Sequence, residues 1–448
     1  MTLPPQNVQA AAPAAGLIRR LGPLDAAAIV ISNVIGGGIF FVPIIVAQLV
    51  PNPWWMLGVW LFGGALAFAG AMAYAELASV RPHAGGEYVY LRDAFGPLAA
   101  FLTGWTSFVA GFSGAIAASA VALADYVTRF VPAAASARPA IAIAAIATLT
   151  VIHVRGLGPG RIVQNVLAGL KVSAIVLIVA AGFAIGHGSA ANFSSGAVTA
   201  PIPWVLALVP VMFSYSGWNA AAYVAEEVRN PSRNVPLALA LGTIAVIVLY
   251  VALNALYVFV LPMPQLASLD GRLMDTVAER LFGFATGNLI ALFTIVSLAA
   301  SISAMVLAGP RVYFAMARDG IFVRAAGRVH PRFHTPATAI IAQAVWSSVL
   351  VLSGTISQLV NYTGFAVVLF AAIAVCALFV LRRRNPLAPR PFSALGYPWA
   401  PAIFVIASAV MVGNALWRQP KTTLAGCAVI LVGVPVYFLF KSGKSAQN

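Results

Sequence analysis

Two clusters of small and polar residues interrupt long apolar runs, and these clusters are the residues best suited to bind a ligand. The first is Gly36-Gly37-Gly38, inside an uncharged run from residue 26 to residue 50. The second is Phe213–Asn219, inside an uncharged run from residue 203 to residue 225. A helix break at membrane depth is tolerated only where protein or a water-filled cavity covers it. Paired breaks in two widely separated membrane spans are typical of a substrate site.

The depth of the two breaks agrees with such a site. Thirteen residues separate Leu24 from Gly37, or about 20 Å of helix at 1.5 Å per residue. Twelve residues separate Trp204 from Ser216, or about 18 Å. Both breaks are therefore expected near the middle of a hydrocarbon core that is about 30 Å thick.

The chemistry expected at the breaks is complementary. Backbone N–H groups of Gly36 to Gly38, at the start of a new half-helix, favour a carboxylate. Freed carbonyls of Phe213, Ser214 and Ser216 would accept hydrogen bonds from an ammonium group. Together these groups describe the backbone of an amino acid. Ser32 and Tyr215 complete the expected set of substrate-binding residues.

A competing interpretation applies to the first break. Glycine clusters in membrane helices often form close-packing surfaces between helices. The second break fits that interpretation less well, because its aromatic, hydroxyl and amide residues show no regular small-residue spacing.

Lys171 is the third candidate. It lies ten residues past Arg161, about 15 Å into a span that is otherwise uncharged from Ile162 onward. A charge at that depth costs at least ~2.5–3.5 kcal/mol on insertion scales. Lys171 would then carry a proton during transport, or would be a fixed cation where a sodium ion otherwise sits. The alternative is a lysine whose amine reaches the membrane surface.

Other charged residues are assigned structural roles. Glu76, Glu226 and Glu227 are interpreted as solvated charges at helix ends near arginines, with gate salt bridges as the second hypothesis. Asp125 is expected to pair with Arg129 one helical turn away. The sequence contains no catalytic triad, metal-ligand cluster or phosphate loop, so neither an enzyme nor a cofactor is predicted. No acidic residue is near either break in the sequence, which favours substrates with small or neutral side chains.

The amino-acid composition indicates which kind of fold holds these residues in place. Of 448 residues, 61% are hydrophobic and 8% are charged, and the mean hydropathy is +0.94. A soluble domain carries roughly 25% charged residues, so we predict an all-α polytopic membrane protein. The net charge of +15 does not indicate nucleic acid, because the basic residues fall in short segments between apolar runs. Cys376 and Cys427 lie inside apolar runs, which indicates neither a disulfide nor a metal site.

About 20 apolar residues per crossing give twelve predicted spans. The third, Ala94–Val131, is long enough to be tilted or to extend past the bilayer, and the seventh is predicted to start at Pro236. The breaks fall in the first and sixth spans. A separation of five spans predicts two inverted repeats of five helices, followed by two C-terminal helices.

Domain boundaries follow from these spans. We expect a disordered cytoplasmic tail at 1–22 and a core at 23–381, with repeats at about 23–186 and 204–381. A cytoplasmic loop and the last two spans occupy 382–441, and a tail occupies 442–448. Arginine and lysine are concentrated in alternate loops, which predicts that both termini are cytoplasmic.

The motifs resemble those of the amino acid–polyamine–organocation superfamily, and within it bacterial relatives of the L-type amino acid transporters. The similar segments are Ile35–Phe40, Pro82–Tyr88, Phe213–Asn219, Glu226-Glu227 and Asn230–Pro236. The resemblance extends over essentially the whole chain after the N-terminal tail.

The resemblance implies that Gly36 to Gly38 bind the substrate carboxylate and that carbonyls of Phe213, Ser214 and Ser216 bind the α-amino group. It also implies that Phe213 is an aromatic gate and that Lys171 makes transport sodium-independent. Gly37 departs from the serine usual in the family, so one hydroxyl donor is lost. The outer loop 132–139 lacks cysteine, so no disulfide-linked heavy chain is expected.

The sequence therefore predicts a secondary amino acid transporter in a bacterial-type cytoplasmic membrane. It would work by alternating access, with proton symport favoured over obligatory exchange. A channel or an intramembrane enzyme is the rival from another class. A channel is expected to have a continuous polar lining, whereas these polar residues cluster at one depth. An enzyme would need several convergent groups at depth, where only Lys171 is found.

Overall fold

The computed structural model describes residues 16–194, 201–270, 273–283, 287–354 and 356–445. Within these ranges the regular structure is helical, apart from one isolated bridge between Leu21 and Val228. Nine helices in the described part are long and apolar enough to cross a membrane, and one bent pair, α1 with α2, forms a further broken span. The predicted all-α polytopic membrane protein is confirmed at this level.

The helices of the first half of the chain are α1 (Pro23–Val34), α2 (Gly38–Leu49), α3 (Pro53–Val80), α4 (Glu87–Phe95), α5 (Pro97–Thr106), α6 (Phe112–Phe130), α7 (Arg138–Val154) and α8 (Leu157–Ile185). A π-helical turn, Ser107–Gly111, joins α5 to α6. It makes one continuous span of Pro97–Phe130, which agrees with the predicted long third span.

The helices of the second half are α9 (Pro201–Ser214), α10 (Ala220–Tyr223), α11 (Pro231–Val260), α12 (Met263–Ala267), α13 (Leu273–Phe282), α14 (Gly287–Ala308), α15 (Pro310–Arg318), α16 (Ala337–Ser353), α17 (Ile356–Arg384), α18 (Trp399–Arg418) and α19 (Pro420–Ser445). The apolar parts of α9 and α16 are shorter than those of the nine long spans.

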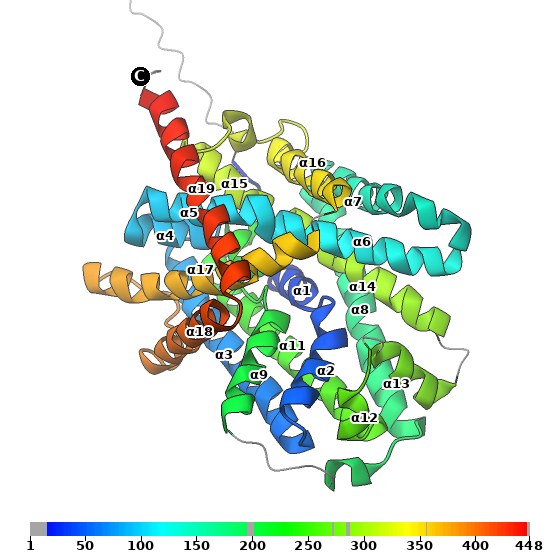
Figure 1. Ribbon diagram of the computed structural model, residues 1–448. Coiled ribbons are helices and arrows are strands. Elements are labelled where there is room, and N and C mark those ends of the chain that lie inside the picture. The colour runs from blue at the N-terminus through cyan, green and yellow to red at the C-terminus, as the bar shows by residue number, and fades with distance from the viewer. Residues whose placement is uncertain (1–15, 195–200, 271–272, 284–286, 355, 446–448) are drawn as a thin grey trace, which may run out of the picture.

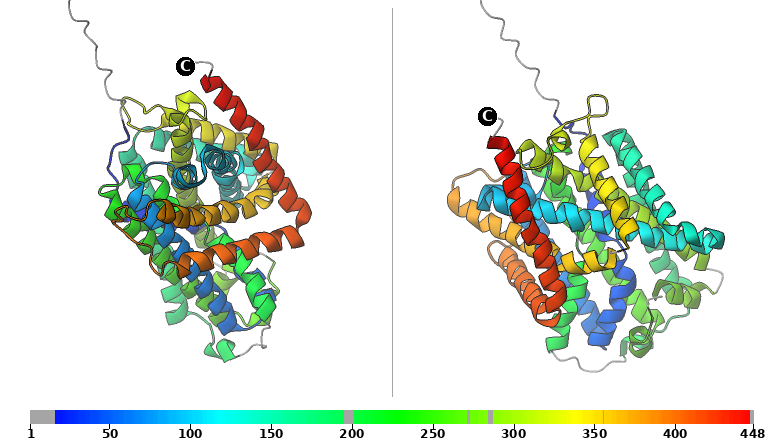
Figure 2. Two further views of the ribbon diagram at one scale, coloured as in Figure 1. Left: turned by 90° about the vertical axis from the view of Figure 1, so that its left-hand side faces the viewer. Right: turned by 45° about the horizontal axis from the view of Figure 1, so that its top comes forward.

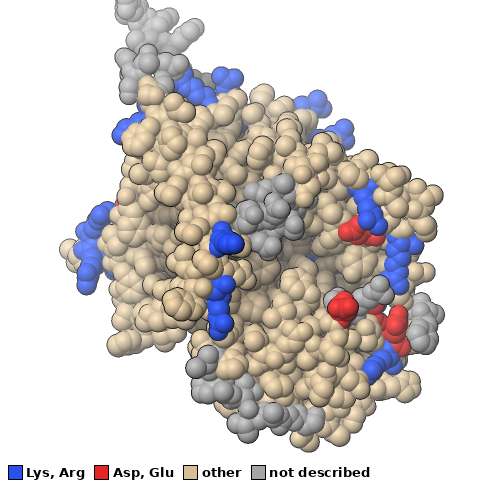
Figure 3. All heavy atoms as spheres, viewed as in Figure 1, with Lys and Arg blue, Asp and Glu red and all other residues tan. Residues whose placement is uncertain are grey.

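The helices are arranged around a core of α1, α11 and α14 (Figure 1). The most apolar window of the α14–α15 span is 72% buried inside the protein, whereas those of α18 and α19 are each 22% buried. The last two helices therefore lie at the periphery, as the side view in Figure 2 shows. Much of the face in Figure 3 is uncharged, as expected for a surface that contacts lipid.

The first predicted break is present. The axes of α1 and α2 differ in direction by 51° at the junction Ile35–Gly37. The second break is also present: α9 ends at Ser214, and a turn of five residues separates it from the short α10. The sequence thus located both interruptions correctly.

One predicted helix start is wrong. The seventh span begins at Pro231, not at Pro236, which lies inside α11. Asn230, just before it, has a positive φ of 46° and reverses the chain. Proline is tolerated in the first turn of a helix because its missing N–H has no intrahelical partner there. Pro231 occupies that position, so the helix starts at the earlier proline.

The segment before α1 is tied to the core. The backbone N–H groups of Arg20 and Leu21 donate to the Glu227 carbonyl at 2.9 and 3.0 Å. The Arg229 N–H donates in turn to the Leu21 carbonyl at 2.9 Å, and Leu21 is buried. These residues belong to the predicted N-terminal tail, whose first fifteen residues are outside the described part of the chain.

Candidate functional site

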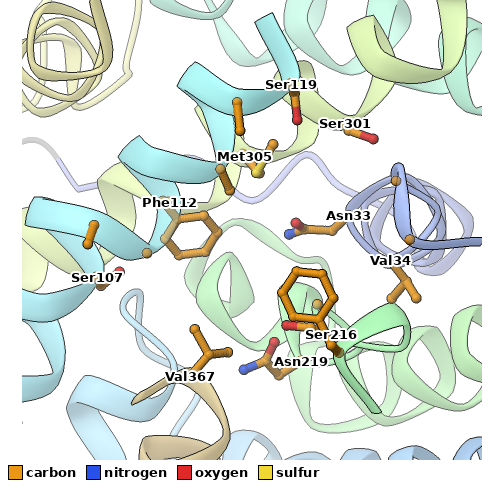
Figure 4. Close-up of a pocket in the computed structure, with 18 of the residues that line it drawn as sticks. Asn33, Val34, Ser107, Phe112, Ser119, Ser216, Asn219, Ser301, Met305 and Val367 are labelled. Atoms are coloured by element: carbon orange, nitrogen blue, oxygen red, sulfur yellow. The ribbon is translucent and has the colours of Figure 1, made fainter. Parts of the chain in front are cut away.

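A cavity of about 410 Å³ lies between the two helix breaks. That volume is within the usual range for small-molecule sites. Its walls come from the α1–α2 junction, the α9–α10 junction, the middle of the α5–α6 span, α14 and α17. Figure 4 shows Asn33 and Val34 of α1 across the cavity from Phe112 and Ser107.

The first break presents free amides to this cavity. Gly36, Gly37 and Gly38 all line it. The Gly36 N–H donates to the Val34 carbonyl at 2.8 Å, but within the described chain no acceptor is recorded for the N–H of Gly37 or Gly38. These two amides begin α2, where the helix dipole favours an anion. The geometry suits a carboxylate.

The two breaks also contact each other. An alanine Cβ placed on Gly38 would be 2.8 Å from Oγ and 3.2 Å from Cα of Ser214. A Cβ on Gly37 would have no atom within 4 Å. Of these two glycines, only Gly38 must lack a side chain, because the α9–α10 junction approaches it closely.

The second break is less open than expected. Phe213, Ser214 and Ser216 all line the cavity. However, the Phe213 carbonyl accepts from the Ser216 N–H at 3.0 Å, and the Ser214 carbonyl lies 3.1 Å from the Tyr250 hydroxyl. Only the Ser216 carbonyl has no donor recorded among the described residues. The expectation of three free carbonyls is corrected to one free and two partly engaged, because the turn between α9 and α10 supplies a donor to Phe213 and Tyr250 of α11 supplies one to Ser214.

The Tyr250 hydroxyl bridges the two breaks. It lies 3.0 Å from the Val34 carbonyl on α1 and 3.1 Å from the Ser214 carbonyl on α9. Tyr250 is buried and packs edge-on against Trp60, with 5.5 Å between ring centroids.

Phe213, the predicted gate, lines the cavity and is 44% exposed. Tyr215 and Ser32 do not line it. The Tyr215 hydroxyl instead donates to the Trp60 carbonyl of α3 at 3.0 Å. Ser32 contributes its carbonyl to the environment of Lys171.

Lys171 is fully buried between α8, α1 and α14. Its Nζ donates to Ser301 Oγ at 3.0 Å, to the Ser32 carbonyl at 3.3 Å and to the Ile35 carbonyl. The last two carbonyls are at the C-terminal end of α1, where intrahelical donors run out. The interpretation as a lysine that reaches the membrane surface is therefore wrong. Lys171 caps the first break, and Ser301 connects it to the cavity wall.

Lys171→Ala is expected to lower the transport rate about tenfold without preventing folding. The substitution leaves the Ile35 and Ser32 carbonyls without their cationic donor, a loss of about 1–3 kcal/mol for buried polar groups. Substrate uptake by purified protein in liposomes, measured over a range of pH, tests this. Lys421→Ala, at an exposed position, is the control. Unchanged transport at every pH would make Lys171 a purely structural residue.

Three ion pairs are formed by residues of α15 and by the residue that follows it. Arg311 of α15 donates from Nε and Nη2 to the two carboxylate oxygens of Glu227, both at 2.9 Å, and both side chains are at most 1% exposed. Arg318 pairs with Glu226 at 3.1 Å, and Arg92 pairs with Asp319 at 2.8 Å. We call these three pairs the ion-pair layer. They connect α15 to α4 and to the segment after α10.

The prediction of solvated helix-end charges is therefore wrong for Glu227, which is fully buried, whereas Glu226 is partly exposed and pairs with an exposed arginine. The same prediction is also wrong for Glu76, which is 2% exposed and accepts from Arg382 Nε at 2.8 Å. Asp125 pairs with Arg138 at 3.4 Å and not with Arg129, whose guanidinium contacts Asp275. The partners are far apart in the sequence, and the nearest arginine along the chain is not the nearest in space.

Sequence reasoning missed one ionisable group of the cavity. Glu87, the first residue of α4, lines the cavity. This corrects the expectation that no acidic residue is near either break. The preceding glycines have positive φ angles, 110° at Gly85 and 51° at Gly86, and they turn the chain back toward the core. That glycine pair was the signal in the sequence that Glu87 is not in an ordinary exposed loop.

Comparison with known proteins identifies the family. The sequence profile of the family described as amino acid permease matches residues 21–439. The chain belongs to the amino acid permease family. The resemblance to the amino acid–polyamine–organocation superfamily is confirmed, and the chain is a multi-pass membrane transporter of amino acids.

Relatives within the amino acid permease family match over nearly full length. A serine/threonine exchanger of Bacillus subtilis (strain 168) is 29% identical over 441 residues, which cover 96% of this chain and 99% of the relative. The cystine/glutamate transporter of Homo sapiens is 30% identical, with 95% and 85% covered. The b(0,+)-type amino acid transporter 1 of Mus musculus is 28% identical, with 95% and 88% covered.

Proposed function

We propose that this permease is a secondary active transporter that holds the amino acid backbone between the two helix breaks and works by alternating access. The free amides of Gly37 and Gly38 would bind the carboxylate, and the Ser216 carbonyl, with Phe213 and Ser214, would bind the ammonium group. The observation that carries the proposal is that one cavity is lined by Gly37, Gly38 and Ser216, whose two amides and one carbonyl have no hydrogen-bond partner among the described residues. Phe213 would close over the bound substrate.

The proposed substrates are amino acids with small or neutral side chains. The cavity wall opposite α1 contains Phe112 but is otherwise rich in small residues, among them Ala110, Gly111, Ala115 and Ser119. Glu87 is the one acidic side chain in the lining among the described residues. The relatives are named for different substrates, serine and threonine in one case and cystine and glutamate in another, so side-chain preference depends on this wall.

We propose the following topology. The nine long spans, the broken α1–α2 span and the short helices α9 and α16 make twelve spans. The first ten form two inverted repeats, and α18 and α19 follow as an addition. Both termini and the ion-pair layer are cytoplasmic, and the membrane is a bacterial cytoplasmic membrane. No disulfide-linked heavy chain is needed.

Coupling is proposed to be sodium-independent, with proton symport favoured and obligatory exchange as the second candidate. Lys171 supports sodium independence because its amine occupies a site of backbone carbonyls and a hydroxyl that would otherwise suit a small cation. The exchanger hypothesis is supported by the name of the Bacillus subtilis relative. Channel and enzyme functions are disfavoured by membership of a family of carriers.

The test is transport by purified protein in liposomes. Saturable counterflow of labelled amino acid distinguishes a carrier from a pore. Uptake driven by a pH gradient into liposomes without internal amino acid is the result expected for symport. If uptake occurs only with amino acid inside, symport is rejected and exchange is the function. Thermal stabilisation across the twenty amino acids identifies the substrate, since a ligand stabilises the state that it binds.

A further inference from the structure

The acidic residues of the protein differ in whether they form an ion pair, and this difference concerns the cavity. Eight of the eleven Asp and Glu residues form ion pairs with described arginines. Glu87 is the acid that lines the cavity, and within the described chain no cation lies within ion-pair distance of it. An isolated carboxylate in such a place is unfavourable unless a positive charge arrives or a proton binds.

The partners of Glu87 are hydroxyl groups. Tyr74 donates to Oε2 at 2.9 Å, Thr103 donates to Oε1 at 3.4 Å, and the Tyr223 hydroxyl also bonds the carboxyl. Asn219 Nδ2 in turn donates to the Tyr223 oxygen at 3.0 Å. Thr103, Tyr223 and Asn219 all line the cavity, and Figure 4 shows Asn219 beside Ser216. The network therefore extends from Glu87 to the break that is proposed to bind the substrate amine.

We propose that Glu87 is the proton-binding site of transport, and that a neutral amino acid is carried together with the proton on this carboxyl. The inference rests on the proposed transport function and deepens it, because it assigns the coupling ion to a residue. The protonated carboxyl is neutral, so a substrate without side-chain charge enters a cavity lined by uncharged groups. After release of the substrate, the proton leaves to the more alkaline side.

The electrostatic surroundings agree with this role. Burial raises the pKa of the Glu87 carboxyl above its ordinary value, while the bonds from Tyr74, Tyr223 and Thr103 act in the opposite direction. The titratable groups that face Glu87 are Tyr74 of α3, Tyr90 of α4 and Tyr223 of α10. Tyrosine ordinarily titrates near pH 10, so these three do not change charge in the physiological range.

The charged groups of the neighbouring helices are engaged elsewhere. On α15, Arg311 binds Glu227, and Arg318 binds Glu226. On the same helix end, Asp319 binds Arg92 of α4. On α17, Arg382 binds Glu76, and Arg384 donates to the Asp93 carbonyl. Glu87 is therefore the group next to the cavity whose charge is free to change with occupancy.

The experiment compares wild type with Glu87→Gln in liposomes, using the amino acid that gives counterflow with wild type. For wild type we expect a pH gradient to drive accumulation, and exchange to rise roughly tenfold as the pH is lowered and the carboxyl becomes protonated. For Glu87→Gln, which is permanently neutral, we expect no gradient-driven accumulation and exchange that does not vary with pH. Glu279→Gln on α13, outside the cavity lining, is the matched control and should behave as wild type.

The outcomes separate the two proposals. If wild type shows no counterflow of any amino acid, the transport function itself is wrong. If wild type shows counterflow but no gradient-driven accumulation, the protein is an exchanger and Glu87 is not a proton carrier. Accumulation that persists in Glu87→Gln also overturns the inference. Loss of lysine or arginine transport in that variant, without any change in proton coupling, also overturns the inference. The carboxylate of Glu87 would then serve to bind the cationic side chain of the substrate.

A second variant covers the case in which Glu87→Gln does not fold. Tyr223→Phe removes one hydroxyl donor to the carboxylate and so favours the protonated form. The acid-stimulated part of the exchange profile is expected to move to higher pH. An unmoved profile in a folded Tyr223→Phe protein would exclude Glu87 as the titrating group.

Discussion

Gly38→Ala is expected to weaken amino acid binding roughly tenfold, whereas Gly37→Ala changes it by less than about threefold. The added Cβ at Gly38 would lie 2.8 Å from Ser214 Oγ and 3.2 Å from Ser214 Cα. The hydroxyl can rotate away, but Cα cannot, so the two helix breaks must separate. The required shift is a few tenths of an ångström, which weakens the hold of two groups that bind one ligand from opposite sides, and a tenfold loss of affinity corresponds to about 1.4 kcal/mol. At Gly37 a Cβ has no atom within 4 Å, and its φ of −66° is ordinary for alanine.

The measurement is substrate affinity by thermal shift and by counterflow for both variants in parallel. Gly37→Ala is a matched control because both glycines line the cavity and belong to the same junction. Equal effects of the two substitutions would show that the cavity tolerates closer contact. The glycines would then be a packing surface of the kind found in many membrane helices, and not a close approach around a ligand.

Arg311→Ala is expected to lower the free energy of unfolding by about 3–5 kcal/mol, the cost of leaving a buried ionic partner without its counter-charge. Arg311 and Glu227 are 1% and 0% exposed and are joined by two hydrogen bonds of 2.9 Å. Glu227 would remain buried with a full charge. Its backbone carbonyl also holds Arg20 and Leu21, so the loss extends to the segment before α1.

Thermal unfolding of purified protein in detergent tests this prediction. Arg318→Ala is the matched control, because it breaks a pair in the same helix whose arginine is 53% exposed, and such pairs contribute about 0–1 kcal/mol. The double variant Arg311→Ala with Glu227→Gln should recover part of the loss, since no isolated charge remains. A stability of Arg311→Ala equal to that of Arg318→Ala would contradict the assignment of the buried pair as the stabilising element of the ion-pair layer.

The sequence predicted most of what depends on local composition. Both breaks, at Gly36 to Gly38 and after Ser214, follow from residues that leave helical geometry within an apolar run. The burial of Lys171 follows from its depth in an uncharged span. These features can be predicted from the local sequence, because lipid contains no water to hydrogen-bond a free backbone group or to solvate a charge. Such groups must therefore be covered by the protein.

The features that the sequence did not predict depend on which spans are neighbours. Glu76 was expected to be near Arg81 but pairs with Arg382, which is 306 positions away. No acidic residue was expected near either break, yet Glu87, the first residue of α4, lines the cavity. The engaged carbonyls of Phe213 and Ser214 require the position of Tyr250 and the turn geometry. No residue pattern along the sequence predicts any of these contacts.

The hydroxyl of Tyr250 couples the two helix breaks, because it can donate to a carbonyl of either one. A tyrosine hydroxyl carries one proton, yet it lies within hydrogen-bond distance of both the Val34 and the Ser214 carbonyls. The two carbonyls therefore compete for a single donor. An ammonium group that satisfies Ser214 leaves the hydroxyl entirely to Val34, at the end of α1. If the substrate binds as proposed, occupancy of one half-helix would be signalled to the other by reorientation of one O–H bond, without displacement of either backbone.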